Sequence, residues 1–317
     1  MIGIGIDAGG TFVKIAAVDE EGNIREETQI ASAPEQGVET FVRNISAVVS
    51  AWRKKLGREK MCAGIGIAGD VDPEKGVVRY SPNLNKWREV QIAKPMSEAT
   101  GLPCVLENDA TVAAWGAYDY ELKRKYNTVL AVTMGTGIGG GLVLDGKLYH
   151  GATGSAGEIG HVNVVYEGEL CNCGDRGCVE AYAGHYGIMR RAAQILPRLP
   201  DTSLLKKMAQ SEKVSGDLLC RAADQGDEDA LRIWKETGLY LGRALADVCL
   251  IINPDAIVLA GGVSRAHAHF LPGMAEAFSQ RRIDTPFRHV KIIPARSPNL
   301  GSIGAAMFAL QWRKAKK

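Results

Sequence analysis

Three cysteines and one histidine in the middle of the chain have the types and spacing of a metal site. Nine residues separate His161 from Cys171, and Cys173 and Cys178 follow within the next seven positions. Thiolate sulfur and imidazole nitrogen together are typical ligands of Zn²⁺, and two glycines between the cysteines allow the segment to curl around one ion. Because four protein ligands leave no position for water, the pattern predicts a structural zinc site.

The other cysteines indicate a reduced chain. Seven is an odd number, which excludes a fully paired disulfide framework. Four of the seven lie among apolar residues and are expected to be small buried side chains. Acidic side chains outnumber Arg176 around the zinc motif, which argues against nucleic-acid binding by this segment.

A second group of polar residues is suited to holding and activating a hydroxyl. Glu107, Asn108 and Asp109 end a predicted strand and precede a predicted helix. An aspartate at a strand end can accept the proton of an attacking hydroxyl, as in the catalytic loop of kinases. The alternative is that Asn108 or Asp109 is simply the N-cap of the helix.

Two further carboxylates flank the zinc motif. Glu158 comes three residues before His161, and Glu180 two residues after Cys178, so an ion that orders the motif also orders both acids. Carboxylates accept hydrogen bonds from vicinal hydroxyls, and an asparagine both donates and accepts them. His161 can bind zinc with one ring nitrogen and donate from the other. The arrangement predicts a site for a polyhydroxylated sugar.

Two glycine-rich turns are candidate phosphate sites. The first is Asp7-Ala-Gly-Gly-Thr11, and the second is residues 135–140, with the sequence G-T-G-I-G-G. No helix is expected after the second turn, so a dinucleotide-binding turn is excluded, and no Walker A motif occurs in the chain. Glycines let backbone N–H groups approach an anion, Thr11 and Thr136 add hydroxyl donors, and Asp7 can act through Mg²⁺. The alternative is that both are ordinary turns.

The elements that must position these residues alternate between strands and helices. Strands are expected at 2–6, 12–18, near 24–30, and at 62–68, 103–106, 128–133, 141–144, 256–260 and 289–293. Helices are expected at 36–56, over about fifteen residues after 109, and at 180–196, 202–211, 215–225, 227–252, 264–280 and 300–313. The pattern of strand, glycine-rich turn and strand restarts at residue 128. It predicts a duplicated lobe whose two turns face each other and hold one polyphosphate.

Length and composition agree with two lobes. A chain of 317 residues exceeds what one hydrophobic core usually covers. Apolar residues make up 46% and charged residues 23%, and the formal net charge is +2, which gives no reason to expect a nucleic-acid or membrane partner. No apolar run approaches the roughly 20 residues that span a bilayer, and no secretory signal is visible. A cytoplasmic location is therefore expected.

Taken together, the motifs resemble the ROK family of sugar kinases and repressors, most closely its bacterial glucokinases. The resemblance covers essentially the whole chain. It is carried by DAGGT at 7–11, SPNLNKW at 81–87, END at 107–109, MGTGIGGG at 134–141, GATGSAGEIGH at 151–161, CNCGDRGCVE at 171–180 and AGG at 260–262. The zinc motif is the most specific of these, and the glycine-rich turns are the least specific.

The resemblance implies an α/β chain with the actin-like (ribonuclease H-like) fold of a two-lobed ATPase and a structural zinc loop. It implies a small lobe of residues 1–117 plus 301–317, and a large lobe of residues 118–300 that carries the zinc loop 161–180. ATP and sugar would bind in the cleft between the lobes, with Mg²⁺ on the nucleotide. A homodimer is common in the family.

The resemblance also implies roles for single residues. Asp109 matches the general base that takes the proton from the sugar 6-hydroxyl. The residues that match sugar-binding positions are Asn83, Asn108, Asp109, Glu158, His161 and Glu180, with the Gly69 backbone. Those that match nucleotide-binding positions are Asp7, Gly9, Gly10, Thr11, Lys14, Gly135, Thr136 and Gly137 for the phosphates, and Gly261 and Gly262 for the adenosine.

The function implied is ATP-dependent phosphorylation of the 6-hydroxyl of glucose. Three alternatives stay open: a kinase for another hexose or an N-acetylhexosamine such as N-acetylmannosamine, a glucokinase that uses polyphosphate, and a sugar-sensing repressor. The repressors of the family carry a helix-turn-helix segment before the first glycine-rich turn, whereas here a strand is expected from Ile2. A sugar-binding module without catalysis is expected to lack Asp109 or the glycine-rich turns.

Overall fold

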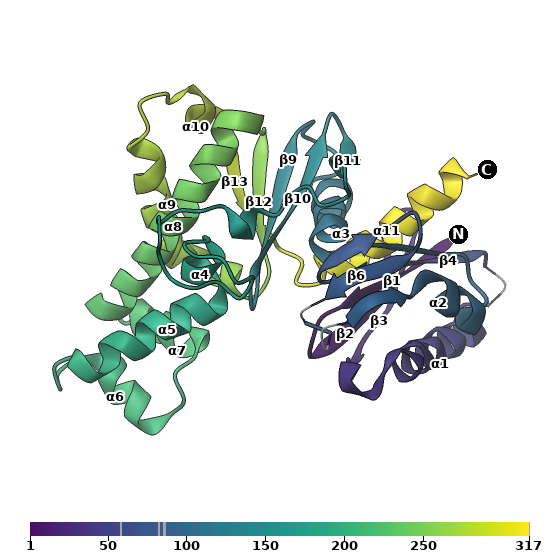
Figure 1. Ribbon diagram of the computed structural model, residues 1–317, viewed down its shortest axis with the longest axis horizontal. Helices are drawn as coiled ribbons and strands as arrows, with labels where there is room; N and C mark the ends of the chain where they lie inside the picture. Colours follow the sequence, from purple (N-terminus) through teal and green to yellow (C-terminus); the bar gives the residue numbers. More distant parts are fainter. Residues whose placement is uncertain (58, 82, 85–86, 317) are drawn as a thin grey trace. The chain divides into compact units, whose positions relative to one another are not determined.

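The computed structural model describes residues 1–57, 59–81, 83–84 and 87–316 (Figure 1). The chain forms two compact units. The first consists of Met1–Ala131, Gly141–Gly157 and Arg296–Lys317, and the second of Val132–Gly140 and Glu158–Ala295. The boundary therefore falls inside two strands that follow residue 128, and not at residue 118, where the sequence placed the start of the large lobe.

A five-stranded sheet forms the centre of the first unit. Its order is β3 (Ile24–Ala31), β2 (Phe12–Asp19), β1 (Ile2–Ala8), β4 (Met61–Ile67) and β8 (Cys104–Asn108). The strands β1, β2 and β3 are antiparallel hairpins, whereas β1, β4 and β8 are parallel. In β1, isoleucines alternate with glycines, so one face of the strand is bulky and the other is flat.

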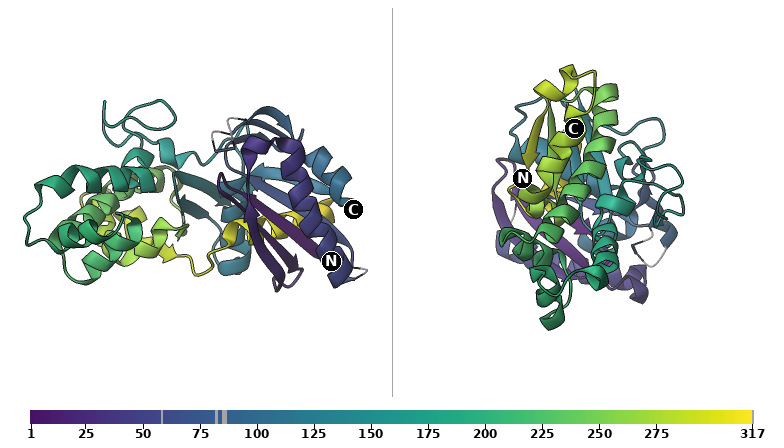
Figure 2. Two further views of the ribbon diagram at one scale, coloured as in Figure 1. Left: turned by 90° about the horizontal axis from the view of Figure 1, so that it is seen from below. Right: turned by 90° about the vertical axis from the view of Figure 1, so that its left-hand side faces the viewer.

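Helices cover both faces of this sheet. The apolar stripe of α1 (Val38–Leu56) packs in one core with the isoleucines of β1. On the flat face lies α11 (Leu300–Ala315), so close that a Cβ on Gly5 would come within 1.7 Å of the Ser302 carbonyl oxygen. The glycines of β1 are therefore required for this packing. Both chain termini belong to this unit (Figure 2).

The first unit also contains elements that the sequence pattern did not predict. A three-stranded sheet consists of β5 (Asp70–Asp72), β6 (Val77–Ser81) and β7 (Trp87–Gln91), and α2 (Ala93–Thr100) follows it. These elements are short and have little periodicity. The ring of Trp87 meets that of Phe41 on α1 edge to face, with 5.3 Å between centroids. Within the SPNLNKW motif, residues 82, 85 and 86 lie outside the described residues.

The second five-stranded sheet repeats the order of the first. Its strands are β11 (Lys147–Tyr149), β10 (Ile138–Leu144), β9 (Val129–Met134), β12 (Ala256–Ala260) and β13 (Lys291–Pro294). In both sheets the third, second, first, fourth and fifth strands in chain order lie side by side. This shared order agrees with the duplication that the repeated sequence pattern predicted.

The rest of the second unit is mainly helical. Its helices are α4 (Glu180–Ala183), α5 (His185–Ile195), α6 (Leu204–Ser211), α7 (Gly216–Asp224), α8 (Glu228–Ile252), α9 (His267–Ser279) and α10 (Thr285–His289). The single helix predicted over 180–196 is wrong, because Gly184 is extended and separates α4 from α5. The longest helix, α8, lies along α9 (Figure 1), and its Gly238 meets the Phe270 carbonyl oxygen at a distance that excludes a side chain.

Two helical features differ from the sequence analysis. α10 was not predicted. In the first unit, α3 (Asp109–Trp115) continues as a π-helical segment to Glu121.

Candidate functional site

The predicted site residues divide between the two units, and each unit brings its own set together. In the first unit, the parallel strands β1, β4 and β8 end at one edge of the sheet. Asp7 pairs with Gly66, which in turn pairs with Glu107, so the first glycine-rich turn and the END segment follow the ends of β1 and β8, with β4 between them. The sheet therefore places a candidate phosphate turn and a candidate base at the same edge.

The turn between β1 and β2 is held by hydrogen bonds at its base and is open at its tip. Gly9 donates its backbone N–H to the Phe12 carbonyl oxygen at 3.0 Å, and the Ser32 hydroxyl donates to the Gly9 carbonyl oxygen at 2.7 Å. Gly10 and Thr11 are exposed. A Cβ on Gly10 would come within 2.7 Å of the Asn83 carbonyl oxygen, so the structure brings Asn83 beside this turn.

Asp7 lies just before the turn in an unfavourable place for a negative charge. Removal from water raises its pKa from 3.8 to about 6, although the positive charge of Lys14 opposes this shift. A Cβ at Gly301, the second residue of α11, would come within 2.3 Å of the Asp7 carboxylate. Lys14, a predicted phosphate ligand, donates through Nζ to the Pro298 carbonyl oxygen at 3.2 Å.

Asn108 is the N-cap of α3, which is the alternative role that the sequence analysis gave for Asn108 or Asp109. Its Oδ1 accepts the backbone N–H of Thr111 at 3.0 Å, and its Nδ2 donates to the Gly69 carbonyl oxygen at 3.0 Å. The side chain thus joins three segments: the end of β8, the start of α3 and the turn after β4. Asp109 is the first residue of α3. Because Asn108 caps the helix directly before it, Asn108 positions the backbone from which the Asp109 side chain extends.

The zinc motif folds into a cluster of four ligand atoms in the second unit. The candidate atoms of His161, Cys171, Cys173 and Cys178 all lie within 4.8 Å of one another. Sγ of Cys173 lies 3.8 Å from Sγ of Cys178, and Sγ of Cys171 lies 3.8 Å from Nδ1 of His161. These separations fit a tetrahedral Zn²⁺ with bonds of about 2.0–2.3 Å.

The electrostatics of the cluster favour a bound cation. Burial, and after it the two neighbouring cysteines, together raise the pKa of Cys178 to about 12. Three thiols this close resist losing their protons unless a positive charge lies between them. The donor set and its geometry therefore fit zinc.

The acidic residues that flank the motif lie close to it. Oε2 of Glu158 is 3.7 Å from Nε2 of His161, the ring nitrogen that faces away from Cys171, and the side chain of Glu158 is 55% exposed. Glu180 accepts the backbone N–H of Ile138 through Oε2 at 2.8 Å, and the Tyr186 hydroxyl donates to Oε1 at 3.4 Å. Glu180 thus connects the zinc motif to the second glycine-rich turn. The sequence analysis did not predict this connection.

The second turn, between β9 and β10, is supported from two sides in this unit. The N–H of Gly135 donates to the Gly137 carbonyl oxygen at 2.9 Å, and the His185 N–H donates to the Gly135 carbonyl oxygen at 3.1 Å. A Cβ on Gly137 would come within 2.1 Å of Oε2 of Glu180, so a larger residue there would displace this carboxylate. Gly261 has φ of 92°, and a Cβ on it would come within 2.4 Å of the Met134 carbonyl oxygen. Thr136, Gly261 and Gly262 are exposed.

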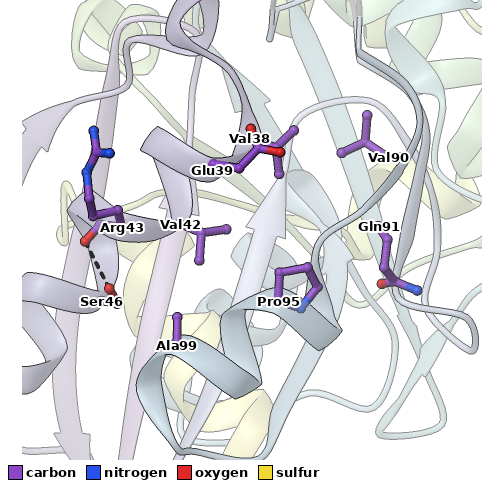
Figure 3. Close-up of a pocket in the computed structure, with 9 residues that line it drawn as sticks. All are labelled: Val38, Glu39, Val42, Arg43, Ser46, Val90, Gln91, Pro95 and Ala99. Atoms are coloured by element: carbon purple, nitrogen blue, oxygen red, sulfur yellow. Dashed lines mark hydrogen bonds between the residues drawn. The ribbon is translucent and has the colours of Figure 1, made fainter.

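Two cavities of the first unit lie apart from these residues. One has a volume of about 600 Å³ and is lined by α1, β7 and α2, with Val42, Pro95 and Ala99 along its walls (Figure 3). It contains none of the predicted site residues that the structure describes. The other has a volume of about 1250 Å³ and is lined in part by Glu107, which belongs to the END segment, and by His150, which the sequence did not indicate as a functional residue.

No helix in the described residues is both long enough and apolar enough to cross a membrane.

Comparisons with known proteins give a consistent family assignment. The model of the ROK family matches residues 3–312. A glucokinase of Streptomyces coelicolor is 34% identical over 313 residues, which cover 96% of each chain. An N-acetylmannosamine kinase of Vibrio cholerae is 32% identical over 298 residues, covering 92% of this chain and 93% of that protein. The crystal structure of a ROK family glucokinase from Streptomyces griseus, in complex with glucose and AMPPNP, superposes with a TM-score of 0.85 at 34% identity, covering 98% of this chain and 100% of that one.

Proposed function

The chain belongs to the ROK family, and from this premise we propose that it is an ATP-dependent kinase that phosphorylates the 6-hydroxyl of glucose. The observation that carries the proposal is the shared sheet edge of the first unit, where Asp109 and the turn after Asp7 follow the ends of two parallel strands, β8 and β1, with β4 between them. A base and a phosphate-binding turn at one edge are what transfer of a phosphoryl group to a hydroxyl requires. The similarity to glucokinases supports glucose as the acceptor.

In the proposed mechanism, Asp109 accepts the proton of the sugar 6-hydroxyl as its oxygen attacks the terminal phosphorus of ATP. The bond between the 6-oxygen and phosphorus forms, the bond to the bridging oxygen of ATP breaks, and ADP leaves. Asn108 caps α3 and holds the Gly69 carbonyl, so it keeps Asp109 and the neighbouring backbone in position. Glu158, His161, Glu180 and Asn83 bind the remaining hydroxyls of the sugar.

The two glycine-rich turns bind the phosphates of ATP in this proposal. The residues proposed for the first turn are Gly9, Gly10 and Thr11, and those for the second are Gly135, Thr136 and Gly137, while Gly261 and Gly262 are proposed to border the adenosine. Asp7 would hold Mg²⁺, whose preference is for carboxylate and water oxygens. When bound, that ion neutralises charge on the transferred phosphoryl group. Zinc would be held by His161 and the three cysteines, where it orders Glu158 and Glu180.

The direct test is an assay of sugar-phosphate formation with a panel of sugars and two phosphoryl donors. Glucose, mannose, fructose, N-acetylglucosamine and N-acetylmannosamine are each assayed with Mg²⁺-ATP and with polyphosphate. Glucose with ATP should have the highest kcat/KM. A higher value for N-acetylmannosamine would favour the second candidate, which the similarity to the Vibrio cholerae enzyme supports. No turnover of any sugar with either donor would refute a kinase.

Replacing Asp7 by asparagine should stabilise the free protein while weakening its use of Mg²⁺-ATP. The raised pKa means that the folded chain retains a proton that the unfolded chain releases, so stability falls as pH rises from about 4 to 6. Above pH 6 the full loss is about 1–3 kcal/mol, and Asp7→Asn removes it. We expect a Tm higher by about 2–6 °C at neutral pH and a KM for ATP raised at least tenfold.

The matched control is Asp19→Asn at the end of the next strand. Burial raises the pKa of Asp19, but hydrogen bonds from Asn23 and the Glu21 N–H outweigh burial and lower it. This substitution should therefore lower Tm in the neutral range. An Asp7→Asn protein with unchanged Tm and unchanged KM for ATP would remove Asp7 from the proposed role.

The homodimer that the family resemblance implies and the cytoplasmic location that the sequence analysis expects remain predictions. Light scattering of the purified chain measures the first. A mass of one chain at micromolar concentration would contradict it.

A further inference from the structure

A buried carboxylate lies directly behind the proposed base. The side chain of Glu107 is only 1% exposed, and both of its oxygens have partners. Oε1 accepts the backbone N–H of Asn108 at 2.9 Å, and Oε2 lies 2.8 Å from Nε2 of His150. A carboxylate removed from water to this extent persists because these two partners replace its hydration. Glu107 therefore connects the end of β8 to a segment 43 positions later in the chain.

The position of β8 explains why Asn108 needs this acceptor. β8 is the outermost strand of its sheet, so every second backbone N–H points away from the neighbouring strand. The N–H of Asn108 is one of these, since it bonds to Glu107 and not to β4. Together with the Thr111 N–H and the Gly69 carbonyl, Glu107 is the third group that holds Asn108. The orientation of the residue next to Asp109 thus depends on where the Glu107 carboxylate lies.

His150 fixes that carboxylate from the opposite side and is suited to carry a positive charge there. The hydrogen bond to Glu107 raises the pKa of His150, and this effect exceeds the opposing effect of burial. The imidazole is 36% exposed and borders the 1250 Å³ cavity, so it exchanges protons with solvent. The other charged groups around this cavity are Asp72, Glu74, Lys75, Arg79, Lys94 and Lys316. Arg79 is paired with Asp70 and Asp72, and Lys75 with Asp72.

His150 also begins the loop that leads to Glu158. The N–H of Ala156 donates to the His150 carbonyl oxygen at 3.1 Å and closes the loop. Gly151, Gly154 and Gly157 all have positive φ values, which glycine adopts readily. The loop between His150 and Glu158 therefore contains three residues with high conformational freedom of the backbone. The contact with Glu107 is therefore a fixed point at the start of an otherwise adaptable segment.

We propose that His150 is a positioning residue: through the buried Glu107 carboxylate, its protonated imidazole holds Asn108, and with it Asp109, in the geometry needed for phosphoryl transfer. The inference deepens the proposed function and rests on it. Loss of the proton weakens the contact without unfolding the chain, because a neutral imidazole can still donate one hydrogen bond. The kinase then becomes slower at high pH through a group that never contacts substrate.

The first test compares pH profiles of wild type, His150→Lys and His150→Gln. Wild-type kcat should decline as pH rises through the pKa of His150, which lies above the ordinary value of about 6.5. Lysine keeps its charge to about pH 10, so His150→Lys should retain most of the neutral-pH rate and lose the decline. His150→Gln should have a kcat about 10–100-fold below the low-pH value of wild type and should lack the decline with pH, with KM for sugar changed much less. Parallel profiles of wild type and His150→Lys would overturn the proposal.

The second test needs no substrate and separates this inference from the proposed function. The imidazole of His150 is titrated by NMR in wild type and in Glu107→Gln, and hydrogen exchange is measured for residues 104–111. The pKa of His150 should fall in Glu107→Gln, and exchange at Asn108 should accelerate in His150→Gln. Unchanged values would overturn the inference even if the enzyme phosphorylates glucose. Both changes in a protein that phosphorylates no sugar would leave the coupling in place and remove the proposed function.

His289→Gln is the matched control, since His289 is an exposed histidine at the end of α10 in the other unit. Its profile should follow wild type. If His150→Gln does not fold, the comparison of wild type with His150→Lys still decides the outcome.

Discussion

Asp109→Asn will fold, bind glucose and lose most of its turnover. The asparagine has the same shape, and α3 keeps its cap because Asn108 still accepts the Thr111 N–H. It cannot accept a proton from the sugar hydroxyl, so kcat should fall by about 10²–10⁴-fold, the range that general bases contribute. Because the lost interaction forms mainly in the transition state, kcat and kcat/KM should fall together while KM changes little. A coupled assay gives the rates, and calorimetry gives the affinity for glucose.

The loss of a negative charge from the first turn of a helix should by itself have only a small effect on stability, and a control variant measures this effect. Asp229 also lies in the first turn of a helix, α8, and pairs there with Arg232. Asp229→Asn should lower stability by about 0.3–1 kcal/mol and leave kcat unchanged. Asp109→Asn should show a similarly small change in stability. Turnover within threefold of wild type would exclude Asp109 as the base.

Cys173→Ala will abolish zinc binding and with it most of the affinity for sugar. Cys173 is the exposed cysteine of the cluster, so its replacement removes a metal ligand without opening a cavity in the core. Without the ion, His161 and the segment before Glu180 lose the constraint that orients the two acids. We expect zinc content to fall from about one per chain to near zero and KM for glucose to rise about 10–100-fold. Elemental analysis and steady-state kinetics measure these two quantities.

Two further observations make this prediction specific. Since Glu180 also accepts the Ile138 N–H, the second glycine-rich turn should loosen, and KM for ATP should rise as well. Cys220→Ala, on α7 outside the cluster, is the control and should keep both zinc and activity. A fully active Cys173→Ala protein without zinc would contradict a structural metal at this site.

Features that depend on neighbours in the sequence were predictable. The four candidate zinc ligands lie within 18 consecutive residues, so their spacing alone constrains them to one loop, and the structure brings their ligand atoms within 4.8 Å of one another. The hairpins around the two glycine-rich turns follow from alternating apolar residues and turn signals. The longest helix, α8, was predicted at 227–252 and found at Glu228–Ile252, because a long amphipathic period with Asp227 as its cap is a strong local signal.

Weak local signals produced the errors. The strands β5, β6 and β7 have three to five residues each, too few for a period, and they form because they pair with one another and lie beside α1. Gly184 interrupts the helix predicted over 180–196, since a Cβ there would come within 2.7 Å of the Glu180 carbonyl oxygen and the backbone is extended at this point.

The amino-acid order by itself determined which chemical groups this protein carries and in which turns and strand ends they lie. Only the tertiary structure decided what surrounds each group. Asp7 acquires its raised pKa at a strand end that α11 covers from nearly 300 positions along the chain, and Glu107 meets His150, which follows β11, across 43 positions of the chain. Periodicity reports which face of a segment is buried, whereas desolvation and hydrogen bonding depend on which distant segment covers that face.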